Sequence, residues 1–346
     1  MKRIAALSIS AMALAAIAPA CKEESRASVA PRQIIFASAP RSPFAVGSRP
    51  TSIAVEDINR DGKLDIITAN RDSNNATVLL GDGQGDFLAA PQSPFAAGTA
   101  PEFVAIGDLN GDKNPDLVFA QHAGGYNLTI LSGDGKGKFL PARKSLPAPL
   151  KSTDPHNHGL VLIDVNRDGN LDILTANAGS NAGRADNSMS VLLGNGRGGF
   201  RHAAGSPLSI GRLPASIVIS DVNRDSKMDI VTANEGAKDI SMFLGDGIGR
   251  FKSAASFPFS LPTYANDIAI GDVNRDSNPD FVITHDDSSL VTLLLADGAG
   301  GFKAAPGSPF DLGHHAWNII VCDVDGDSSI DIVMRGPNDR IMILLG

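Results

Sequence analysis

The sequence predicts an all-β fold in which six four-stranded sheets form a six-bladed β-propeller. A nine-residue pattern, D-x-[ND]-x-D-x-x-x-D, begins at Asp57 and recurs at Asp108, Asp164, Asp221, Asp272 and Asp323. Successive copies start 51, 56, 57, 51 and 51 residues apart, a repeat length typical of propeller blades. The 346 residues include 36 Gly and 21 Pro, which favours many turns over long helices.

The N-terminus has the features of a secretory signal. Lys2 and Arg3 precede an apolar run over residues 4–17, and Ala18-Pro19-Ala20-Cys21 follows. We expect residues 1–20 to be the signal peptide and residues 21–33 to be a flexible tether. Cys21 is either the lipidated first residue of a bacterial lipoprotein or a residue left by ordinary cleavage after Ala20. Both alternatives imply an extracytoplasmic location, at the cell envelope or secreted.

Residues 34–346 are predicted to form the propeller. In the first repeat, apolar segments lie at 52–55, 66–68 and 78–80, and a Gly-rich turn then leads to Phe87 and a fourth segment with Ser-Pro-Phe at 93–95. Four short strands in about 50 residues are typical of a blade.

The two ends of the chain are predicted to complete one blade together. Phe36 lies 21 residues before Asp57, as Phe87 does before Asp108, so residues 34–47 resemble a fourth strand without a preceding blade. The last repeat stops at Gly346, where the others continue into their Gly-rich turn. An N-terminal strand that completes the last blade would close the ring and cover an exposed sheet edge. A seven-bladed ring is the alternative, but the sequence has no seventh copy of the pattern.

The repeated loops are candidate calcium sites. Alternating oxygen side chains on a tight loop suit Ca²⁺, which takes six to eight oxygen ligands. The candidate ligands at positions 1, 3, 5 and 9 are Asp57, Asn59, Asp61, Asp65; Asp108, Asn110, Asp112, Asp116; Asp164, Asn166, Asp168, Asp172; Asp221, Asn223, Asp225, Asp229; Asp272, Asn274, Asp276, Asp280; and Asp323, Asp325, Asp327, Asp331. The loops therefore hold 19 Asp, three in each of five copies and four in the sixth. This is half of the 38 acidic residues in the chain. Turn formation by Asp and Asn without metal is the alternative.

Position 6 of the loop is Gly only at Gly62 and Gly169. Lys113, Ser226, Ser277 and Ser328 occupy it in the other copies, and we expect those loops to be strained or to bind calcium more weakly.

With these motifs the chain resembles the secreted FG-GAP/VCBS-repeat proteins, whose calcium-bearing blades also occur in integrin α-subunit propellers. The resemblance covers residues 34–346 and implies up to six structural Ca²⁺ ions, held by the loop residues named above. Adhesion and ligand binding are common roles in that family, although the same fold also supports enzymes.

Alternation of strand direction predicts where a ligand binds. The calcium loops and Gly-rich turns belong at one end of the strands, the bottom face, whereas the loops between second and third strands and between repeats belong at the top face. Top-face candidates for ligand binding are Glu102, His156, His158, Asn266, His315 and Trp317. Variable loops on a rigid scaffold are common binding sites, but they are also where polar residues accumulate without function.

The predicted function is a non-enzymatic, calcium-binding module that binds a glycan or a cell-surface protein. The formal net charge of −8, without a basic run, argues against nucleic acid as a partner. An enzyme that acts on polysaccharides, a lyase or hydrolase using top-face His residues, is the alternative, although the sequence has no nucleophile elbow or H-E-x-x-H motif. A structural role at the envelope is a third possibility.

Overall fold

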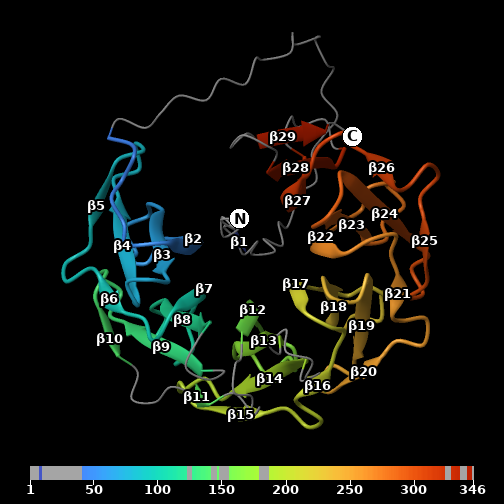
Figure 1. Ribbon diagram of the computed structural model, residues 1–346. Helices are drawn as coiled ribbons and strands as arrows, with labels where there is room; N and C mark the ends of the chain where they lie inside the picture. The colour runs from blue at the N-terminus through green and yellow to red at the C-terminus, as the bar shows by residue number, and fades with distance from the viewer. Residues whose placement is uncertain are drawn as a thin grey trace, which may run out of the picture.

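The computed structural model describes residues 8–9, 41–122, 127–141, 146–147, 156–178, 187–323, 329–335 and 341–344. Within them the fold is all-β, built from six sheets whose strands follow one another in chain order. Figure 1 shows these sheets arranged around a central space, and the first strand of each is innermost. The innermost strands of consecutive sheets contact each other from the first sheet to the sixth.

Each sheet repeats one arrangement, apart from β1 at the inner edge of sheet 1 and from differences in the amount of outer strand that is described. Sheet 1 consists of β1 (Ser8–Ile9), β2 (Pro50–Glu56), β3 (Asp65–Asn70), β4 (Asn75–Gly81), β5 (Phe87–Ala89) and β6 (Phe95–Ala96). Sheet 2 consists of β7 (Pro101–Gly107), β8 (Asp116–Gln121), β9 (Asn127–Gly133), β10 (Phe139–Pro141) and β11 (Leu146–Pro147). Sheet 3 consists of β12 (His156–Ile163), β13 (Asp172–Ala178), β14 (Ser188–Gly194), β15 (Phe200–His202) and β16 (Leu208–Ser209).

The remaining three sheets follow the same order. Sheet 4 consists of β17 (Pro214–Ser220), β18 (Asp229–Asn234), β19 (Asp239–Gly245), β20 (Phe251–Ser253) and β21 (Phe259–Ser260). Sheet 5 consists of β22 (Ala265–Gly271), β23 (Asp280–His285), β24 (Leu290–Ala296), β25 (Phe302–Ala304) and β26 (Phe310–Asp311). Sheet 6 consists of β27 (Trp317–Cys322), β28 (Asp331–Arg335) and β29 (Ile341–Leu344).

The expected fourth strand is divided into two short pieces. In sheet 1, β5 pairs with the end of β4 and β6 pairs with its beginning. Between them Ser93 N donates to Ala90 O in a turn (2.9 Å), and Pro94 follows. Because Pro has no N–H, the ladder is interrupted there.

The core lies between neighbouring sheets. Between sheets 1 and 2, for example, Ile67 and Val78 pack in one cluster with Val104 and Phe119, all with exposed fractions near zero. Second strands are covered on both faces, which explains their continuous β-branched and apolar sequences.

The first strand of each sheet has a bulge near its start. In sheets 1 and 2 the ladder skips Thr51 and Glu102, and in sheet 6 it skips Asn318. Thr51 is buried, and its hydroxyl donates to Ala69 O and Pro101 O at 3.3 and 3.2 Å, which joins sheet 1 to sheet 2.

At the N-terminus, Ser8 and Ile9 pair with Ser52 and Ile53 in parallel, on the inner edge of β2. The rest of the expected signal peptide and tether, and residues 34–40 of the expected closing strand, lie outside the described residues. No helix among the residues that are described is long and apolar enough to cross a membrane.

Candidate functional site

The nine-residue loops are closed by their own acidic and amide side chains. In the first loop, Asp57 Oδ2 accepts a hydrogen bond from Gly62 N at 2.8 Å, and Asn59 Oδ1 accepts one from Asp61 N at 2.9 Å. Asp61 Oδ1 accepts a bond from Lys63 N at 2.9 Å. The loops that begin at Asp108, Asp164, Asp221 and Asp272 repeat these bonds. The oxygen-rich side chains are thus held around a fixed backbone.

The Asp at position 9 joins each loop to the third strand. In the five loops described in full, its Oδ2 accepts the amide of the position-2 residue at 3.0–3.1 Å, and its Oδ1 accepts an amide at the end of the third strand at 2.8–3.0 Å. These residues, all with exposed fractions of 0–1%, are Asp65, Asp116, Asp172, Asp229 and Asp280. Position 9 therefore has a structural role that the spacing of the pattern does not show.

Position 6 adopts a left-handed backbone conformation in every loop where it is described. The φ angles are 82° and 84° at Gly62 and Gly169, but 69°, 65° and 68° at Lys113, Ser226 and Ser277. Because non-Gly residues pay a steric cost in this region, the expected strain is present in the three described loops that lack Gly. Ser328 lies outside the described residues.

The loops suit a hard cation by their donor chemistry. Burial, together with a smaller effect of the nearby carboxylates on the same loops, raises the pKa of Asp116 and of Asp172 to about 6. Asp221 Oδ1 is buried without a hydrogen-bond partner among the described residues. Carboxylate oxygens that accept one N–H keep lone pairs for a second contact. Three buried or crowded carboxylates with unused acceptor capacity fit Ca²⁺, which would neutralise them.

The described residues do not form a finished metal site. Among them, no three His, Cys, Asp or Glu side chains converge as a metal cluster. In the sixth loop Asp323 and Asp331 are described, whereas Asp325 and Asp327 lie outside the described residues. Calcium binding therefore stays a prediction from the donor set.

At the top face, Glu102 is the centre of a charged cluster. Its Oε2 lies 3.1 Å from Arg71 Nη1 and 3.7 Å from His122 Nδ1. Its side chain is only 17% exposed, and burial raises the pKa of Glu102 while the positive charges of Arg71 and Arg49 oppose that shift. Arg49 also pairs with Asp72 at 3.8 Å. The sequence indicated Glu102, but it gave no reason to select Arg71, Arg49 or His122 as its neighbours.

The other predicted top-face residues are spread over several sheets. Asn266 is half-buried on β22, and His315 is half-buried just before β27. His156 and His158 lie on β12 and Trp317 begins β27, but their side chains lie outside the described part of the chain. Since Glu102 belongs to sheet 2 and Asn266 to sheet 5, these residues would have to act across the ring rather than as one local cluster.

A buried polar cluster recurs where the second strands end. Asn70 Nδ2 donates to Thr77 Oγ1 at 2.9 Å, and Asn177 and Asn234 donate to Ser190 and Ser241 at 2.9 Å each. In sheet 5 the same position is His285, whose Nε2 lies 2.8 Å from Thr292 Oγ1. His285 is fully buried and is the last residue of β23.

Replacing His285 with Asn, the residue of three other repeats, is expected to remove one source of acid sensitivity. Burial lowers the pKa of His285, so the unfolded chain binds a proton near pH 6.5 that the folded state does not. The free energy of unfolding of the wild type should therefore fall as the pH drops below about 6.5. Urea unfolding between pH 8 and pH 5 measures this, and the decline should be smaller in His285→Asn. An equal decline in both proteins would contradict the prediction.

Comparison with known proteins agrees with this architecture. A protein called cartilage acidic protein 1, from Xenopus tropicalis, is 24% identical over 208 residues, which are 58% of this chain and 31% of that protein. The chain therefore spans about a third of the length of this relative.

The fold also resembles solved structures at low sequence identity. A protein of Bacteroides uniformis with a proposed 6-phosphogluconolactonase activity superposes with a TM-score of 0.64 at 14% identity, covering 88% of this chain and 85% of that one. The counterpart from Bacteroides fragilis gives 0.62 at 15% identity, with 87% and 83% covered. The N-terminal part of BBS1, solved in complex with ARL6, gives 0.60 at 12%, with 88% and 82% covered. These similarities show a β-propeller-like fold. At such low sequence identity they do not assign an activity to this chain.

The sequence family is defined by the repeats themselves. The FG-GAP-like repeat matches at residues 57–119, 108–175 and 221–283, which together span more than half of the chain. Each match begins at the first Asp of a nine-residue loop and extends through the following strands. The chain belongs to the FG-GAP-like repeat family.

Proposed function

We propose that this protein is an extracytoplasmic, calcium-stabilised, six-bladed propeller that binds a glycan or protein ligand at its top face without chemical turnover. In this proposal residues 1–20 direct export, and Cys21 and the tether connect the propeller to the cell envelope.

Contacts of residues 41–47 favour a closed ring. Phe44 packs edge-to-face on Phe87 with ring centroids 5.3 Å apart and an interplanar angle of 79°. Phe95 of sheet 1 packs on Phe139 of sheet 2 in the same way, at 5.4 Å and 81°. Phe44 thus makes the contact that the outer strand of a preceding blade would make, as expected for a strand that completes the sixth blade.

The sixth sheet has an edge that such a strand would cover. Strand β29 is the last described strand of this sheet, and Ile343 and Leu344 on it are 36% and 37% exposed. Val78, at the middle of the equivalent strand β4, is fully buried. An uncovered apolar sheet edge promotes aggregation. We therefore propose that residues 34–40 cover the edge at β29.

Calcium would have a structural role in these loops. The oxygens of positions 1, 3 and 5, and of position 9 where it keeps acceptor capacity, would hold the ion, which supplies positive charge to crowded carboxylates. Because the ion would bind only the folded loop, it would stabilise the native state by mass action.

The Glu102 cluster carries the proposal of a top-face ligand site. Burying the Glu102 carboxylate beside Arg71 and His122 costs desolvation free energy. A surface that serves only as an envelope scaffold would not need such a buried charge. The cluster lies at the start of an innermost strand, next to the central space of the ring. Polar groups fixed by a rigid scaffold suit the recognition of a polar ligand.

A binding screen of the calcium-loaded full chain against glycans and extracellular proteins tests this function. We expect at least one ligand whose binding is weakened by about tenfold or more in Glu102→Gln and in a Trp317→Ala, His158→Ala double variant. Binding that all variants retain would move the site away from the top face. Turnover of a polysaccharide would favour the enzyme instead.

A further inference from the structure

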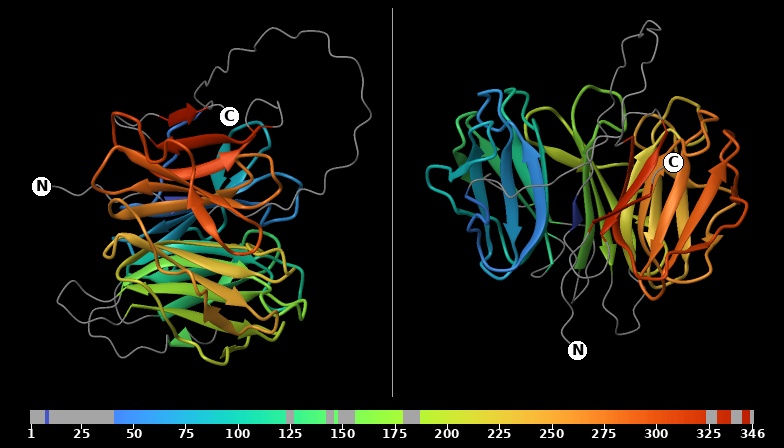
Figure 2. Two further views of the ribbon diagram at one scale, coloured as in Figure 1. Left: turned by 90° about the vertical axis from the view of Figure 1, so that its right-hand side faces the viewer. Right: turned by 90° about the horizontal axis from the view of Figure 1, so that it is seen from above.

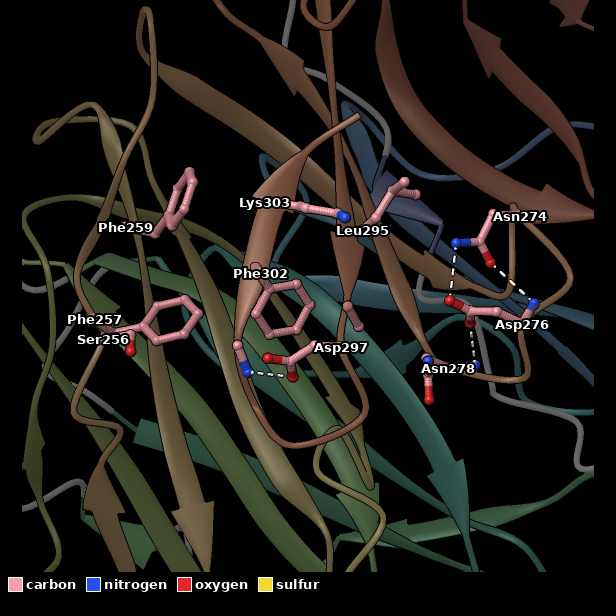
Figure 3. Close-up of a pocket in the computed structure, with 12 residues that line it drawn as sticks. Ser256, Phe257, Phe259, Asn274, Asp276, Asn278, Leu295, Asp297, Phe302 and Lys303 are labelled. Carbon is pink, nitrogen blue, oxygen red and sulfur yellow. Dashed lines mark hydrogen bonds between the residues drawn. The ribbon is translucent and has the colours of Figure 1, made fainter. Parts of the chain in front are cut away.

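A groove of about 590 Å³ lies between sheets 4 and 5, close to the calcium-type loop of sheet 5. Its size falls in the range of about 300–1,000 Å³ that ligand pockets occupy. Figure 3 shows the aromatic side chains Phe257, Phe259 and Phe302 along one part of it. Asn274, Asp276 and Asp297 lie where the strands of sheet 5 meet the bottom turns, so this part of the groove is at the opposite end of the strands from Glu102.

One residue that lines the groove departs from the repeat. In three other repeats a Ser before the Pro of the outer strand accepts an amide of the third strand: Ser93 from Val78 at 3.0 Å, Ser206 from Val191 at 2.9 Å and Ser308 from Leu293 at 2.9 Å. In sheet 4 the residue is Phe257, whose side chain cannot accept such a bond. Its ring instead packs edge-to-face on Phe302 of sheet 5, with centroids 5.9 Å apart.

The aromatic side chains are held in place but remain partly open. Phe302 stacks on the buried Phe281 with centroids 4.3 Å apart, and Phe259 lies 6.4 Å from Phe257. Phe257, Phe259 and Phe302 are all only half-buried, whereas Phe95 and Phe139, at the equivalent seam between sheets 1 and 2, are buried. The seam between sheets 4 and 5 thus exposes ring surface that the other seam covers.

Polar groups with fixed orientations complete the groove. Asp297 Oδ1 accepts the amides of Ala299 and Gly301 at 2.8 Å each, and these bonds lower the pKa of Asp297 and keep it ionised. Its other oxygen accepts no hydrogen bond within the described part of the chain. Lys303 adds donors, and Asn274 Nδ2 donates to Asp276 Oδ2 at 3.0 Å on the neighbouring loop (Figure 3).

We propose that this groove binds a pyranose ring of a neutral or N-acetylated oligosaccharide. A pyranose has an apolar C–H face that can lie on Phe257 and Phe302, and a rim of hydroxyls that donate to Asp297 and accept from Lys303. Asp297, which is not one of the proposed Ca²⁺ ligands, places a carboxylate in the lining beside the aromatic rings, and this charge disfavours acidic sugars there. The site is separate from the proposed top-face function and does not depend on it.

Calorimetric titration of the full chain in calcium buffer with cellohexaose, mannohexaose and chitohexaose tests the proposal, with polygalacturonate as the acidic comparison. At least one neutral or N-acetylated probe should bind. Phe257→Ser should weaken that binding by about tenfold or more. Because Ser is the residue of three other repeats, this variant should unfold at the wild-type temperature or above.

Two further variants separate this groove from the top face. Tyr264→Ser, which removes an aromatic ring exposed at the other end of sheet 5, and Glu102→Gln should both leave oligosaccharide binding unchanged. The proposal is overturned if none of the three neutral or N-acetylated probes binds, if Phe257→Ser binds them as the wild type does, or if polygalacturonate binds more tightly. Loss of binding only in Glu102→Gln would assign the sugar to the top face.

Discussion

Replacing Asp172 with Ala is expected to lower the free energy of unfolding by about 3–5 kcal/mol, in calcium and in EDTA alike. Asp172 is fully buried and accepts two backbone amides, from Val165 at 3.0 Å and from Gly194 at 2.8 Å. Alanine would leave both amides buried without a partner, and each such group costs about 1–3 kcal/mol. Urea unfolding followed by circular dichroism, with and without EDTA, measures the change.

Asp168 on the same loop is the matched control. It is exposed and accepts Asn170 N at 2.9 Å, an interaction that Asn at position 168 can keep. In EDTA, Asp168→Asn should change the free energy of unfolding by no more than about 0.5 kcal/mol. In calcium it should cost clearly more, because the loop would lose a charged ligand. An effect of Asp172→Ala that disappears in EDTA would contradict the structural role of position 9, and equal effects of Asp168→Asn in both buffers would contradict calcium binding.

This difference between positions 5 and 9 shows what the sequence could predict. The spacing of the Asp residues, the turn-forming Gly and the apolar runs are local signals, and they predicted the repeated strands and the loop between the first two strands of each sheet. The bond from Asp172 to Gly194 joins residues 22 positions apart in the chain. It depends on the third strand returning beside the loop, which no local pattern specifies.

The candidate site was harder to predict because rarity in a sequence does not report burial. His285 is one of only seven His residues in the sequence. It nevertheless occupies the buried position that Asn70, Asn177 and Asn234 occupy in three other repeats. Phe257 stands where three other repeats have Ser before Pro, but the sequence does not show that its ring packs on Phe302 of the neighbouring sheet and lines a groove.

The arrangement of the sheets explains why functions at the two ends of the strands can be independent. Figure 2 shows the sheets side by side, with connecting loops gathered at two opposite ends of the strands. Between these ends lie second strands such as β8 and β13, in which every residue is buried. A rigid, covered core of this kind allows substitutions at one end with little effect on the other, because well-separated sites contribute additively.

Deleting residues 34–47 is expected to lower the melting temperature by roughly 5–10 °C and to promote aggregation. The deletion removes the Phe44–Phe87 contact and the bond from Gly47 N to Thr77 Oγ1 at 3.1 Å, and it would also expose the edge at β29. A loss of a few kcal/mol shifts the melting temperature by this amount in a domain of this size. Scanning calorimetry and light scattering of the full chain and the deletion variant provide the measurements.

Two variants distinguish ring closure from simple loss of contacts with sheet 1. Deleting residues 22–33, the expected tether, should leave the melting temperature unchanged. Phe44→Ala removes only the ring contact with Phe87, so it should cost less than the deletion and should not cause aggregation. If the deletion of 34–47 costs no more than Phe44→Ala and stays monomeric, then residues 34–40 do not cover β29, and the six sheets form an open arc. If only the long deletion aggregates, the result supports an exposed sheet edge as the cause, because among the three variants only this deletion would uncover β29.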